Sequence, residues 1–82
     1  MMIKLVFLGK LRALASADLA AALPPEVNTL GGLKAWIATR DPLLHSALAS
    51  TLLALNREIV RDMALGIGDG DEVAFLPPMS GG

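Results

Sequence analysis

The chain has 82 residues, 54% of them apolar, and a net charge of −1, so it can form one globular domain with a modest core. Its seven basic residues lie scattered among eight acidic ones, which leaves no basic stripe of the kind that follows a nucleic-acid backbone. The absence of cysteine excludes disulfides, thiolate nucleophiles and cysteine metal sites, and it fits a cytoplasmic protein.

The N-terminal segment imitates a secretory signal, with an early charge, an apolar patch and the triplet Ala15-Ser16-Ala17. Lys10 and Arg12 interrupt the apolar run, which leaves it too short for such a signal. No stretch reaches the ~18 uninterrupted apolar residues of a membrane span. We therefore expect a soluble, unprocessed protein without a membrane or nucleic-acid partner.

Two strands are predicted at the start of the chain. Residues 2–8 alternate between two faces and carry aromatic and branched side chains, as is typical of a strand. Residues 18–23 alternate in the same way and would complete a hairpin, although their alanine content is also compatible with a helix. The proline pair Pro24-Pro25 ends this second segment.

A helix is predicted next, with Thr29 as its N-cap, because the hydroxyl can accept hydrogen bonds from free amides of the first turn. Apolar residues follow at helical spacing up to Arg40: Leu30, Leu33, Trp36 and Ile37. Asp41-Pro42 has the form of an N-cap and first helical position, and it predicts a second, short helix over residues 42–50.

Three further strands are predicted in the last third of the chain. Residues 51–55 and 59–60 would form a hairpin through the turn Asn56-Arg57-Glu58, and residues 71–76 would form the last strand. The glycines of GIGDG before this strand do not have the spacing of a nucleotide loop. The order of elements predicts an α+β, β-grasp fold, with a mixed sheet of four or five strands over one main helix.

The sequence contains no recognisable catalytic constellation. His45 has no second histidine near it, so a metal would lack ligands. The serine and threonine hydroxyls have no nearby histidine and carboxylate to activate them. We therefore expect no bound metal or cofactor and no catalytic site of the chain's own. For so small a domain, binding of a partner through the surface is a better expectation than catalysis in a deep cleft.

The chain ends in a segment, residues 77–82, that we separate from the domain of residues 1–76. Proline fixes its own φ and favours extended geometry before it, so Pro77-Pro78 should leave the sheet as a stiff stalk. The flexible Gly81-Gly82 end has no side chains and can pass through a channel too narrow for a β-carbon. Glycine-rich ends are also typical of linker remnants and frayed termini.

The terminal carboxylate is the one distinctive reactive group of this tail. A carboxylate acylates poorly until it becomes a mixed anhydride, so the tail implies a separate enzyme that uses ATP to adenylylate Gly82. The protein would then be a substrate and a carrier.

The stretch GDGDEVAFLPPMSGG at residues 68–82, with ALNREIV at residues 54–60, resembles the sulfur-carrier subunits of molybdopterin synthases, members of the MoaD/ThiS family of ubiquitin-like proteins. The chain departs from the family pattern at Met79 and at Gly31-Gly32 in the first helix. Neither departure touches the tail chemistry.

The resemblance implies that Gly82 is adenylylated by a ubiquitin-activating-type enzyme and then converted to a thiocarboxylate with sulfur from a donor protein. Gly81 would be the residue that gives the tail access, and the sulfur would pass to a precursor pterin inside the large subunit of molybdopterin synthase. The alternatives are a carrier for another pathway such as thiamine thiazole synthesis, a ubiquitin-like protein modifier, and a plain interaction domain.

Strand parity also predicts a partner-binding face. It places Val6, Leu8, Ala74 and Leu76 on the sheet face away from the helix, with Ile59 beside Leu8 and Leu76. An exposed apolar patch is typical of a binding site. Leu8, Ile59 and Leu76, together with Pro77 and Pro78, are expected to contact the large subunit.

Overall fold

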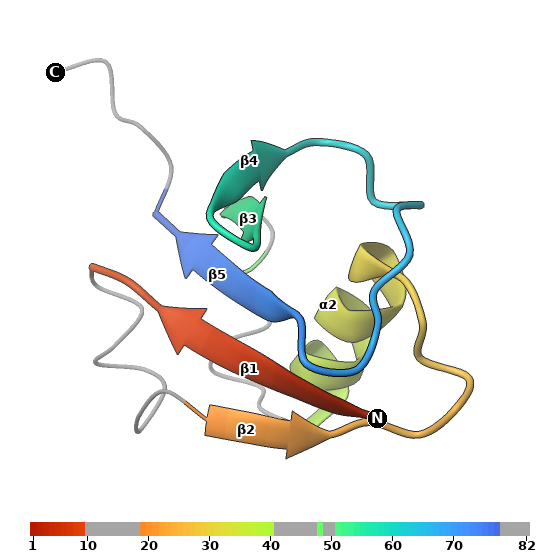
Figure 1. Ribbon diagram of the computed structural model, residues 1–82. Helices are drawn as coiled ribbons and strands as arrows, with labels where there is room; N and C mark the ends of the chain where they lie inside the picture. The colour runs from red at the N-terminus through yellow and green to blue at the C-terminus, as the bar shows by residue number, and fades with distance from the viewer. Residues whose placement is uncertain (10–18, 41–47, 49–50, 78–82) are drawn as a thin grey trace, which may run out of the picture.

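The computed structural model describes residues 1–9, 19–40, 48 and 51–77. They form one five-stranded sheet in the order β2-β1-β5-β3-β4 and one helix, α2 (Figure 1). The elements are β1 (Met2–Phe7), β2 (Leu19–Ala22), α2 (Leu30–Arg40), β3 (Leu52–Leu55), β4 (Glu58–Val60) and β5 (Glu72–Leu76). The helix expected over residues 42–50 lies outside the described residues, His45 included, except for Leu48, which is helical and buried.

The sheet is mixed. β1 and β5, from opposite ends of the chain, pair in parallel at its centre, and the other three pairings are antiparallel. Helix α2 lies across one face (Figure 1). This arrangement confirms the predicted β-grasp fold. It shows residues 19–22 of the predicted second strand as a strand rather than a helix, because β2 pairs with β1.

The core lies between the sheet and the helix and follows the predicted alternation. Inward side chains of β1 and β5 are almost fully buried, and the Phe7 and Phe75 rings stack with centroids 5.2 Å apart. Helix α2 contributes Leu30, Leu33 and Ile37 from one face, as their spacing predicts. The opposite face of the sheet is not covered by any described element, and we call it the outer face.

The first turn of α2 is held by two kinds of contact. The Thr29 hydroxyl accepts a hydrogen bond from the Gly32 amide at 3.0 Å, which confirms the predicted N-cap. The Gly31 amide donates to the Met63 carbonyl at 2.8 Å, and a β-carbon at Gly31 would lie 3.2 Å from that same oxygen. Gly31 therefore lets the chain after β4 approach the helix, which offsets the low helix propensity of glycine.

The β3–β4 hairpin turns through two residues in the left-handed region, Asn56 with φ 51° and Arg57 with φ 71°. This is the turn that the sequence predicts, except that Glu58 already belongs to β4. The backbone amide of Asn56 donates a hydrogen bond to the backbone carbonyl of Glu72 at 2.7 Å, so the turn is fixed to the start of β5.

Candidate docking face and tail exit

The outer face holds a shallow hollow of about 370 Å³. Six apolar and two charged residues line it: Val6, Leu8, Ala54, Ile59, Ala74, Leu76, Arg57 and Glu72. In β1 and β5 the lining residues alternate with buried core residues, so the hollow lies opposite α2. Strand parity thus brings Leu8 and Leu76 to one surface, as predicted, and Ile59 joins them.

The floor of the hollow is a row of residues across four strands. Ala74 of β5 pairs with Val6 of β1 on one side and Ala54 of β3 on the other, and Ala54 pairs in turn with Ile59 of β4. The two alanines in the centre are small and the residues at both ends are branched. The surface is therefore concave, with Ile59 standing at its edge and 49% exposed.

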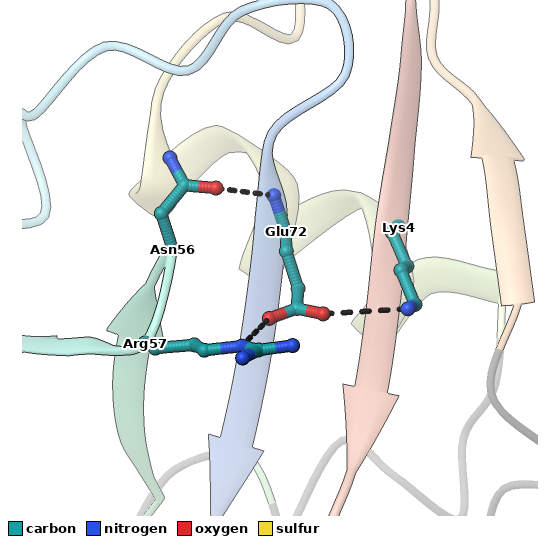
Figure 2. A network of polar contacts seen from close by, with 4 residues as sticks. All are labelled: Lys4, Asn56, Arg57 and Glu72. Carbon is teal, nitrogen blue, oxygen red and sulfur yellow. Dashed lines mark hydrogen bonds and ion pairs between the residues drawn. The ribbon is translucent and has the colours of Figure 1, made fainter.

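A polar cluster lies at the end of the hollow where β5 begins. Figure 2 shows its four residues: Lys4, Asn56, Arg57 and Glu72. Glu72 reaches between Lys4 and Arg57, with nitrogen-to-oxygen distances of 3.4 Å to each, and the Glu72 backbone amide donates to Asn56 Oδ1 at 2.9 Å. Both cations are well exposed, so each ion pair contributes no more than about 1 kcal/mol. The cluster therefore marks the polar border of the apolar surface rather than a source of stability.

The apolar end of the hollow is the end at which the tail leaves the sheet. Phe7 and Phe75 are paired, and the Leu8 amide donates to the Phe75 carbonyl at 3.0 Å, so the β1–β5 ladder continues to the edge of the domain. Leu8 and Leu76 follow that pair, and the half-buried Pro77 comes next. Pro78, Gly81 and Gly82 lie outside the described residues.

Comparison of the sequence with known protein families identifies the family of this chain. The ThiS family matches residues 5–82, nearly the whole sequence and the tail with it. The chain belongs to the ThiS family. The family resemblance that the C-terminal residues predict is thereby confirmed.

Two curated relatives of this ThiS-family chain are similar over their full length. The molybdopterin synthase sulfur carrier subunit of Chlamydomonas reinhardtii is 35% identical over 83 residues, covering 100% of both chains. The subunit of that name from Escherichia coli (strain K12) is 34% identical, covering 99% of this chain and 100% of its own.

Among solved structures, a complex of subunits 1 and 2 of the molybdopterin-converting factor from Helicobacter pylori 26695 contains a similar chain. That chain is 27% identical to this ThiS-family protein with a TM-score of 0.75, and the match covers 100% of both. The two chains thus share the β-grasp fold.

The structure also identifies lining residues that the sequence reasoning missed, namely Ala54, Arg57 and Glu72. Strand alternation predicts Val6 and Ala74 on the outer face as well, and the structure confirms both placements. Only the pairing register shows that Ala54 and Ala74 meet at the centre of this face. The part of the chain that the structure describes contains no group of three or more side chains able to hold a metal, and no helix in it is long and apolar enough to cross a membrane.

Proposed function

We propose that this protein is the sulfur-carrier subunit of molybdopterin synthase and works in the cytoplasm. The observation that carries the proposal is the full-length similarity to two proteins of that name, together with a family match that runs to Gly82. A glycine pair behind a proline pair suits a carrier, because a backbone without side chains can enter a narrow active site.

The carboxylate of Gly82 is the group that carries sulfur. An ATP-dependent, ubiquitin-activating-type enzyme forms the acyl adenylate, with pyrophosphate as leaving group. Sulfur from a donor protein, at the oxidation level of sulfide, then attacks the carbonyl carbon and AMP leaves, which gives the thiocarboxylate. The protein itself binds no ATP and no resident cofactor; its part is to present Gly82, with Gly81 leaving room around the backbone.

The large subunit of molybdopterin synthase docks on the hollow of the outer face. Two observations support this placement: the hollow is apolar and open, with Leu8 and Ile59 exposed by 36% and 49%, and it ends where the chain continues into the tail. Leu8, Ile59 and Leu76 are the apolar anchors, and Pro77 and Pro78 lie where the tail enters the partner. Docking here directs Gly82 toward the precursor pterin held by the large subunit.

The tail chemistry is tested by appending one residue after Gly82. The added residue moves the carboxylate away from the glycine pair and places a side chain at the reacting end. We expect the extended protein to fold and to bind the large subunit, yet to acquire no sulfur and yield no product. Normal product formation by the extended protein would contradict the proposal, and conjugates to lysines of other proteins would favour a modifier.

A further inference from the structure

Gly9 lies next to Pro77, the first residue of the tail. It follows β1 by two residues and has φ +61°, in the left-handed region that side chains other than glycine rarely adopt. A β-carbon at Gly9 would lie 2.9 Å from Cγ and 3.3 Å from Cδ of Pro77. The first distance is shorter than real β-carbon contacts, so the Pro77 ring occupies the space that any other residue at position 9 would need.

The hydrogen-bond ladder cannot hold Pro77 in the way that it holds β5. The ladder continues as far as the bond from the Leu8 amide to the Phe75 carbonyl, but proline has no N–H with which to extend it. Beyond that bond, the Pro77 ring lies in the space beside Gly9 that a β-carbon would fill. Since the ring fixes φ of Pro77, a displaced ring moves the Pro77 backbone with it.

We infer that Gly9 is a positioning residue for sulfur transfer. Because Gly9 has no β-carbon, the Pro77 ring can occupy the space beside it, and the position of this ring directs the tail. This inference rests on the proposed function, because the course of the tail matters only if Gly82 must reach a partner's active site. A misplacement of about 1 Å at reacting atoms can cost on the order of 100-fold in rate, so a shift of Pro77 that reaches Gly82 should slow transfer.

The chain offers a matched control at Gly70. This glycine also has a positive φ, +87°, but a β-carbon there would meet nothing within 4 Å. Gly70→Ala and Gly9→Ala therefore both strain the backbone, and only Gly9→Ala displaces Pro77. Gly9→Asn separates the two effects in a second way, because asparagine tolerates the left-handed region and still carries a β-carbon.

The experiment measures single-turnover sulfur transfer from the thiocarboxylated carrier to the precursor pterin, at saturating large subunit, with affinity and melting temperature measured in parallel. We expect Gly9→Ala to slow transfer about tenfold or more while affinity stays unchanged. Gly9→Asn should be equally slow, and Gly70→Ala should transfer at the wild-type rate even though its melting temperature falls. In the Pro77→Ala background, which lacks Cγ and Cδ, adding Gly9→Ala should change the rate much less.

The contact itself is observed in the isolated protein as nuclear Overhauser effects between the α-protons of Gly9 and the ring protons of Pro77. Wild-type transfer rates in Gly9→Ala, full recovery in Gly9→Asn, or an undiminished effect of Gly9→Ala in the Pro77→Ala background would each overturn the inference. A wild-type protein that takes up no sulfur would instead overturn the proposed function, and the inference with it.

Discussion

Replacing Leu8 by aspartate tests the docking face most sharply, because the chain supplies a matched control. Leu8 lines the hollow and is 36% exposed, whereas Leu65 is 37% exposed and does not line it. The two leucines thus carry the same side chain at the same exposure in different surroundings. Leu8→Asp and Leu65→Asp should have similar effects on the isolated domain, and only Leu8→Asp should affect the complex.

The expected loss of affinity has two parts. Full burial of a leucine side chain contributes about 1.5 to 3 kcal/mol, so the exposed third of Leu8 can still gain roughly 0.5 to 1 kcal/mol on docking. Aspartate removes that gain and adds the cost of burying an unpaired carboxylate, at least about 1 to 3 kcal/mol. We expect a total of about 2 kcal/mol or more, which is roughly a 30-fold rise in Kd.

The assay is calorimetric titration of each variant into the large subunit, with thermal unfolding of the isolated variants alongside. Unchanged affinity for Leu8→Asp would refute the docking face. A Leu65→Asp variant that binds as weakly as Leu8→Asp would refute the choice of the hollow. A large fall in the melting temperature of Leu8→Asp alone would show that Leu8 supports the core instead.

Two further predictions concern the tail and the core. Gly81→Ala should impair adenylylation or sulfur transfer far more than binding, since a β-carbon obstructs the tail inside a partner's active site; weaker binding with normal turnover at saturation would contradict this. Phe75→Ala should lower the free energy of unfolding by about 3 to 5 kcal/mol in denaturant titrations, because Phe75 is fully buried and stacked on Phe7. A change below about 1 kcal/mol would show that its ring is not part of the core.

Much of the fold could be predicted from local patterns. The strict alternation in residues 2–8 and 71–76 assigns Leu8 and Leu76 to the outer face without knowledge of the strand order, because the side-chain period of a strand is two. The N-cap at Thr29 is equally local, since its hydroxyl bonds an amide only three residues away. In these cases the residues that determine the local structure lie within a few positions of each other.

The rest depends on contacts between distant parts of the chain. Ala54 and Ala74 are unremarkable in sequence and become the floor of the hollow only through the β3–β5 register. Gly31 lowers helix propensity and is explained only by the approach of Met63. Gly9 precedes Pro77 by 68 positions, so no local pattern predicts their contact.

The central claim is that Gly82 carries sulfur, and the intact mass of the protein tests it most directly. The protein is incubated with ATP, the activating enzyme and a sulfur source, beside a variant that lacks Gly81-Gly82. We predict that the wild-type mass rises by the difference between sulfur and oxygen, that fragmentation places the change on Gly82, and that the truncated variant keeps its mass. An unchanged wild-type mass, in a reaction where an established sulfur carrier acquires sulfur, would contradict the claim.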